Sequence, residues 1–129
     1  MGDVLPPLEQ ALVALLRQVT GVQVGTKVPA ERPDRFIRLS RTGGSATNRA
    51  QSSPTVLVEC WGADEGKAWS LCASVLPVLR AHRDGADLGR VVVCDASVTE
   101  PVNYPDSATG TPRYQFIYSP TVITEGASL

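Results

Sequence analysis

The stretch PTVLVECWGADEGKAWSLCASVLPVL, residues 54–79, decides the fold of this chain. Residues 54–61 are rich in residues that favour strands, and Gly62 follows them as a turn. Beyond the turn, apolar residues recur at helical spacing and form one stripe: Ala68, Leu71, Cys72, Val75, Leu76 and Leu79. The stretch therefore predicts a strand that leads directly into an amphipathic helix.

Charged residues mark both ends of this predicted helix. Asp64 and Glu65 lie in its first turn and Arg80 in its last, where each charge suits the helix dipole. Pro77 is the exception, because a proline clashes with the carbonyl four residues before it. The sequence leaves open whether Pro77 kinks one helix or starts a second.

A further helix is predicted near the start of the chain. Pro6 and Pro7 suit a first helical turn, and Gly21 suits a C-cap. Between them lies an apolar stripe at helical spacing: Leu8, Leu12, Leu15, Leu16 and Val19.

Alternating patterns predict four more strands, over residues 22–28, 35–41, 90–98 and 113–118. In the last of them, Tyr114, Phe116 and Tyr118 share one face. Pro120 is expected to break or bulge this strand. Residues 121–124 are then expected to form an edge strand or an arm.

Two polar stretches are expected to be loops, residues 43–53 and 100–112. The first contains glycines and serines and almost no apolar residue, and it is expected to project as the tip of a hairpin. Residues 125–129 are expected to be frayed. The predicted order is therefore α-β-β-β-α-β-β in a single domain spanning residues 1–129. This order indicates an α+β fold, a mostly antiparallel sheet with two helices packed on one face.

Composition excludes several classes of function. The 129 residues include 12 basic and 13 acidic side chains, so no overall basic field favours nucleic-acid binding. No segment reaches the roughly 18 apolar residues of a membrane span, and no signal peptide is apparent. The odd cysteine count, Cys60, Cys72 and Cys94, favours buried free thiols over a disulfide framework.

No catalytic, cofactor or metal motif stands out. His82 is the single histidine and lies in a charged helix end, so a cysteine–histidine pair is disfavoured. The cysteines are too far apart in sequence for an evident zinc site. Gly43 and Gly44 lack the pattern of a phosphate-binding loop. The residues alone indicate a non-enzymatic assembly or binding domain without a cofactor.

Arginines and tryptophans are the remaining candidates for contacts. Five arginines cluster in sequence: Arg32, Arg35, Arg38, Arg41 and Arg49. They fit either solvated sheet edges or contacts with acidic subunits or nucleic-acid phosphates. Trp61 and Trp69 fit either core packing or interface anchors.

Three stretches carry a resemblance to a known family. They are VQVGTKVPAERPDRFIRLSRTGG at residues 22–44, ECWGADE at residues 59–65 and GTPRYQF at residues 110–116. Together with the element order, they resemble the tail terminator proteins of long-tailed, siphovirus-type bacteriophages, in the form found in actinobacterial phages. The resemblance covers most of the chain, and its motifs are structural.

The resemblance implies a structural virion protein of the head-proximal neck, made in the host cytoplasm. Such proteins form a hexameric ring on the tail tube, end its growth and join it to the head. The implied partners are further copies of the chain, the tail tube protein, the head–tail connector or stopper, and the C-terminus of the tape measure protein. DNA passes through the lumen without sequence-specific binding, and no membrane is involved.

The resemblance also implies contact residues. Residues 43–53 and residues 102–112 of the two predicted loops are expected to meet neighbouring subunits and to become ordered on assembly. Arg41 and Arg49 are expected to form salt bridges to other subunits or to the tube, and the interface is completed by Arg38, Tyr104 and Arg113.

Rival interpretations remain open. A head-completion adaptor or stopper also forms rings, but the α-β order fits it less well. A minor tail protein would bind the tube without terminating it. A small enzyme or ligand-binding domain would need a pocket with convergent polar groups, which the sequence does not indicate.

Overall fold

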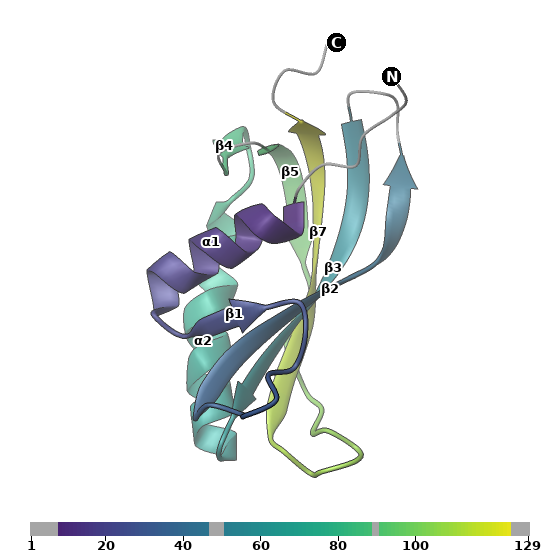
Figure 1. Cartoon of the computed structure of the whole chain (residues 1–129). Helices are drawn as coiled ribbons and strands as arrows, with labels where there is room; N and C mark the ends of the chain where they lie inside the picture. Colours follow the sequence, from purple (N-terminus) through teal and green to yellow (C-terminus); the bar gives the residue numbers. More distant parts are fainter. Residues whose placement is uncertain (1–7, 47–50, 89–90, 125–129) are drawn as a thin grey trace.

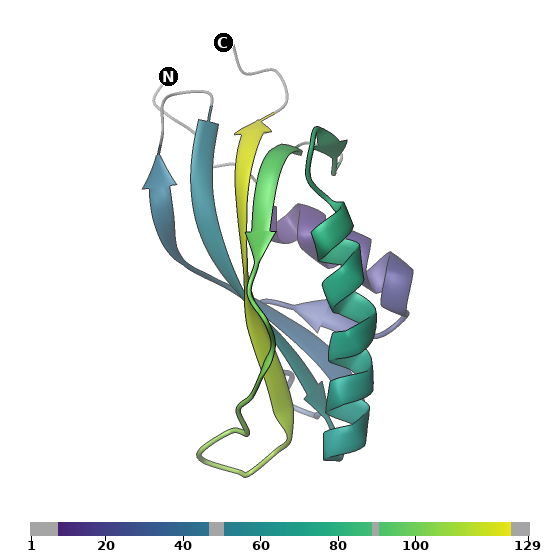
Figure 2. The same ribbon diagram turned by 180° about the vertical axis from the view of Figure 1, so that it is seen from behind.

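A single mixed sheet forms the body of the molecule, and both helices lie on one of its faces (Figures 1 and 2). The computed structural model describes residues 8–46, 51–88 and 91–124. The elements in chain order are α1 Leu8–Thr20, β1 Gln23–Gly25, β2 Arg35–Ala46, β3 Gln51–Gly62, α2 Glu65–Ala81, β4 Ala86–Asp87, β5 Val91–Val98, β6 Val102–Asn103 and β7 Arg113–Thr124. The strands are arranged β1-β2-β3-β7-β5-β4, and β6 pairs with β7 beside β5.

This architecture confirms the predicted α+β class and the order of the long elements. The β2–β3, β3–β7 and β5–β7 pairs are all antiparallel, and only β1 pairs in parallel, with β2. The two-residue strands β4 and β6 were not predicted, and β1 is shorter than the predicted strand over residues 22–28. Within the described residues, no helix is long and apolar enough to cross a membrane.

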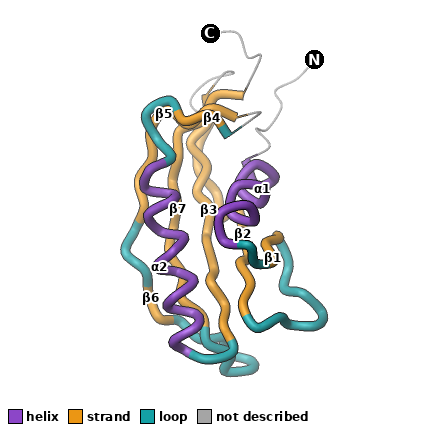
Figure 3. Tube along the Cα trace, turned by 90° about the vertical axis from the view of Figure 1, so that its left-hand side faces the viewer, coloured by secondary structure: helices purple, strands orange, loops and turns teal. Residues whose placement is uncertain are grey.

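The core lies between the helices and the covered face of the sheet (Figure 3). Alternation along β3 and β7 sends every second side chain into it, including Val58, Cys60, Phe116 and Tyr118. The predicted helical stripe of α2 is fully buried against them. Cys60 and Cys72 are buried free thiols, as predicted, whereas Cys94 is half-buried.

Helix α2 begins at a capped residue and continues through its proline. Asp64 is the N-cap, and its Oδ1 accepts a hydrogen bond from the backbone N–H of Lys67 at 2.8 Å. Pro77 lies inside one helix that ends at Ala81 with His82 as its C-cap, so it does not start a second helix. The strand-to-helix turn is tight, because a Cβ on Gly62 would lie 2.4 Å from the backbone nitrogen of Ala68.

The prediction of a loop over residues 43–53 is wrong for most of that stretch. Strand β2 extends to Ala46 and β3 starts at Gln51, with Ala46 opposite Ser52. Glycine permits this pairing: a Cβ on Gly44, whose φ is +121°, would lie 2.3 Å from the Ser53 carbonyl oxygen. The hairpin itself was expected, and its tip, residues 47–50, lies outside the described residues.

Pro120 interrupts the ladder between β3 and β7, as predicted, but the expectation that residues 121–124 form an edge strand or an arm is wrong. Strand β7 runs through Pro120 to Thr124 and lies in the middle of the sheet between β3 and β5. The β3–β7 register places Pro54 opposite Pro120, and residues on either side of this position keep the same register. Because neither proline has an N–H, the pair omits ladder hydrogen bonds at this point without shifting the strands.

Candidate interaction surface

The face of the sheet that carries no helix is the candidate functional surface; we call it the open face (Figure 1). Its first row crosses three strands, with Phe36 of β2, Trp61 of β3 and Arg113 of β7 side by side in the register. The rings of Phe36 and Trp61 are stacked with centroids 5.1 Å apart. The Arg113 guanidinium lies 4.9 Å from the Trp61 ring centroid, which is within cation–π range.

A second row contains a buried carboxylate. The side chain of Glu59 is 4% exposed and accepts contacts from two arginines: Arg38 Nη1 lies 3.2 Å from its Oε1, and Arg113 Nη1 lies 3.2 Å from its Oε2. A carboxylate buried this deeply needs paired donors, because its desolvation is otherwise costly. Glu59 therefore fixes both predicted contact residues in place on the open face.

Arg113 also holds the segment between β6 and β7. Its Nε donates to the Tyr104 carbonyl oxygen at 2.9 Å, and its guanidinium lies 5.4 Å from the Tyr104 ring centroid. Asp106 Oδ1 lies 3.9 Å from Nη1 of the same arginine. The predicted loop over residues 100–112 therefore contains the short strand β6, and the part that follows β6 is attached to the sheet through Arg113.

Apolar side chains surround this cluster and are exposed. Val102 and Tyr104 are each 54% exposed, and Ile117 is 38% exposed. The register places Val102 beside Gln115, and the alternation puts all three on the open face. A rigid arginine–aromatic centre with an apolar border is typical of protein interfaces.

Towards the end of the sheet that carries the β2–β3 hairpin tip, the open face is lined by small hydroxyl side chains. Thr42 and Thr55 hydroxyls lie 2.9 Å apart, and Ser53 and Thr121 hydroxyls lie 3.2 Å apart. These pairs give this end of the face a polar character.

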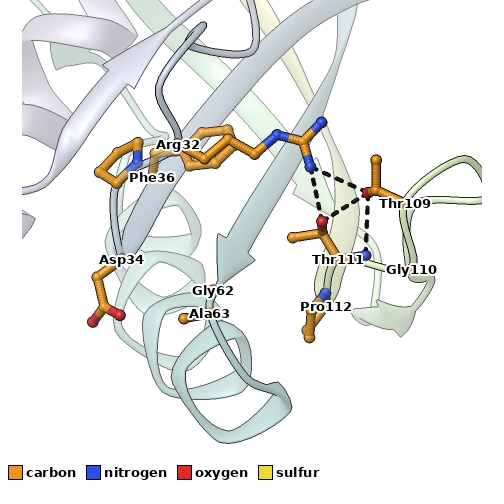
Figure 4. A pocket seen from close by; sticks show the side chains of 10 residues that line it. Arg32, Asp34, Phe36, Gly62, Ala63, Thr109, Gly110, Thr111 and Pro112 are labelled. Atoms are coloured by element: carbon orange, nitrogen blue, oxygen red, sulfur yellow. Dashed lines mark hydrogen bonds between the residues drawn. The ribbon is translucent and has the colours of Figure 1, made fainter.

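Beside the first row, at the opposite end of the sheet, a hollow of about 580 Å³ opens between three segments (Figure 4). It is lined by Arg32, Pro33, Asp34, Phe36, Gly62, Ala63, Thr109, Gly110, Thr111 and Pro112. Two backbone hydrogen bonds join its walls, from Gly62 N–H to the Pro112 carbonyl and from Ala63 N–H to the Asp34 carbonyl.

The structure gives the predicted contact residues different positions. Arg38, Tyr104 and Arg113 come together on the open face. Arg41 lies on the opposite face, where its guanidinium pairs with Glu9 of α1 at 2.7 Å. Burial alone would raise the pKa of Glu9, but hydrogen bonds from Arg41 and the backbone outweigh it and hold the pKa below 4.5. Arg49 lies outside the described residues.

The tryptophans also differ from one another. Trp61 is 2% exposed, yet it lies on the open face away from the main core, and its indole N–H has no partner among the described residues. Trp69 is 48% exposed and contacts Tyr114 at 5.1 Å between ring centroids.

Sequence reasoning missed Glu59 as the centre of this cluster and Arg32 as part of the hollow. The signal for Glu59 was a charged residue between Val58 and Cys60 in an otherwise apolar strand. Across the described ranges, no group of three or more histidine, cysteine, aspartate or glutamate side chains is placed to hold a metal ion.

Neither a scan against protein-family models nor a search of curated proteins found a match to this chain.

Proposed function

We propose that this chain is a tail terminator of a long-tailed bacteriophage, which forms a ring at the head-proximal end of the tail tube. The ring ends tube growth and presents a surface to the head connector. Its partners are further copies of the chain, the tube protein, the connector or stopper and the tape measure C-terminus, and DNA passes through its lumen.

The observation that carries the proposal is the one-sided covering of the sheet. Both helices bury one face, while the other carries a fixed arginine–aromatic cluster bordered by exposed Val102, Tyr104 and Ile117. A set of exposed apolar side chains around arginines that are held in place is a feature of surfaces that bind other proteins.

The edge of β2 supports the same conclusion. Strand β2 has twelve residues, and β1 pairs only with residues 36–38 of it. Within the described sheet, the outer edge of β2 therefore has no partner strand beyond Arg38. Exposed strand edges readily pair with another chain. A ring uses two different surfaces on each subunit, and the open face and this edge provide two.

The test is the native mass of the purified chain at high concentration, with negative-stain images of the same sample. The proposal predicts a closed ring with an open centre. Val102→Arg should dissociate the ring, whereas Val19→Arg should not. Val19 is a matched control, because it is 50% exposed but lies on α1.

The position of the protein on the particle separates this proposal from its rivals. Gold-labelled antibody at the junction of tail tube and neck supports a terminator. Label directly beneath the portal would instead indicate an adaptor or stopper, and label along the tube would indicate a minor tail protein.

A further inference from the structure

The hollow beside the open face contains an arginine that is held in place by hydroxyl groups and makes no direct ion pair among the described residues. Arg32 Nη1 donates to the Thr109 hydroxyl at 3.1 Å and to the Thr111 hydroxyl at 2.8 Å. Its guanidinium also lies 5.4 Å from the Trp61 ring centroid. No carboxylate of the described residues lies within ion-pair distance of it.

The two threonines are themselves fixed as acceptors for this arginine. Thr109 donates its hydroxyl proton to Asp106 Oδ2 at 2.6 Å, so its oxygen acts as the acceptor for Arg32 and for the backbone N–H and hydroxyl of Thr111. The Thr109 hydrogen bond also holds the pKa of Asp106 below its usual value, so this carboxylate is ionised near neutral pH.

Arg32 therefore keeps donors for a ligand. A guanidinium has five N–H donors, and the described residues use only those of Nη1. The other terminal nitrogen points away from the two threonines (Figure 4). This geometry suits a planar acceptor that takes two parallel hydrogen bonds, as a carboxylate does.

The rest of the hollow selects among anions. Phe36 and Pro112 give it apolar walls that suit an aliphatic side-chain stem. Asp34 also lines it, and its carboxylate pairs with Lys67 Nζ at 2.9 Å. Asp106 already offsets part of the Arg32 charge electrostatically, and Asp34 lies beside it, so the hollow suits a singly charged carboxylate better than a doubly charged phosphate.

We infer that this hollow binds an acidic side chain of a partner protein, with Arg32 as its main ligand. Backbone hydrogen bonds from Gly62 to Pro112 and from Ala63 to Asp34 join its walls. The site is thus formed before its ligand arrives, which lowers the entropic cost of binding. The inference goes beyond the proposed ring and does not depend on it.

The experiment is a titration of the isotope-labelled full chain, followed by amide NMR. The probe is a short blocked peptide with one central glutamate, and the control is the same peptide with glutamine. The glutamate peptide should give saturable shifts confined to residues 62–63 and 109–112. The glutamine peptide should bind about tenfold more weakly, because it lacks the charge-assisted pair.

Variants of arginine test the assignment. Arg32→Gln should remove the response, and Arg32→Lys should weaken it by keeping the charge without the planar fork. Arg83→Gln is the matched control, since Arg83 is another exposed arginine and lies outside the hollow. Unchanged signals elsewhere in each spectrum show that the variant is folded.

Four results would overturn the inference: equal binding of the two peptides, no shifts with either, an undiminished response in Arg32→Gln, or tighter binding of inorganic phosphate than of the glutamate peptide. The native mass of the same samples reports on the ring separately. A monomer that binds the peptide would count against the proposed function alone.

Discussion

Glu59 is the residue on which the open face depends most, and Glu59→Gln tests this directly. The substitution keeps the shape of the side chain and removes its charge. Its carboxylate is 4% exposed and receives Arg38 and Arg113, each at 3.2 Å. Glutamine retains one acceptor oxygen, so one guanidinium would face an amide N–H₂ instead.

The magnitude follows from how well each arginine is compensated. Breaking a buried ion pair typically costs about 3–5 kcal/mol. The cost is lower here because Arg38 is 36% exposed and can reach water, and Arg113 retains the Tyr104 carbonyl. We expect a loss of about 2 kcal/mol in the free energy of unfolding, or a fall of about 6 °C in Tm for a chain of this size.

Urea unfolding followed by circular dichroism is the assay, and Glu100→Gln is the control. Glu100 also faces an arginine, Arg80 at 3.5 Å, but its side chain is 84% exposed. The control should therefore lose less than about 0.5 kcal/mol. If Glu59→Gln loses no more than Glu100→Gln, the cluster is not organised around this carboxylate.

Three further predictions concern other parts of the chain. In urea unfolding, Gly62→Ala should lower the free energy of unfolding by about 1–3 kcal/mol, because the added Cβ would lie 2.4 Å from the backbone of α2. An unchanged urea midpoint would show that the turn adjusts without cost. Burial raises the pKa of Tyr118 to about 12, so stability that depends on its neutral phenol should be complete below pH 10 and lost as the pH rises through 12. Tyr118→Phe should remove this alkaline loss and cost about 1 kcal/mol at pH 8, since its hydroxyl donates to the His82 carbonyl; titrations of stability against pH check both effects. The pKa of Glu9 is lowered by Arg41, so the Glu9–Arg41 pair contributes to stability above pH 4.5, and this contribution is lost as the pH falls through the folded-state pKa. Glu9→Gln should therefore reduce the loss of stability at acid pH in the same titration, and an unchanged loss would contradict this.

Periodicity predicted the elements whose burial decides their structure. The stripe of α2 and the alternation of Tyr114, Phe116 and Tyr118 both identify the faces that the structure buries. These patterns are reliable because each reflects the removal of apolar surface from water.

The segments that were predicted wrongly take their structure from pairing with strands that are distant in sequence. Residues 43–46 and 51–53 have the composition of a loop but form strands, because the sheet supplies their hydrogen bonds. Pro120 is tolerated in a central strand because the register sets it opposite Pro54, so the two missing N–H donors fall at one place in the ladder.

The candidate site shows the same limit. Arg38, Tyr104 and Arg113 were proposed as contact residues from a resemblance. In the structure Glu59 pairs with Arg38 and Arg113, and Tyr104 contacts Arg113. Arg32 meets Thr109 and Thr111 across 77 and 79 residues of sequence, so no local pattern predicts the hollow. The pairing of β2, β3 and β7 brings together the segments that carry these residues.

The most direct test of the central claim is electron microscopy of the assemblies made when this chain is deleted from the genome that encodes it. If the chain is a tail terminator, the deletion should yield overlong tails that lack heads, and supplying the chain in trans should restore tails of normal length. Tails of normal length joined to heads in the absence of the chain would contradict the account.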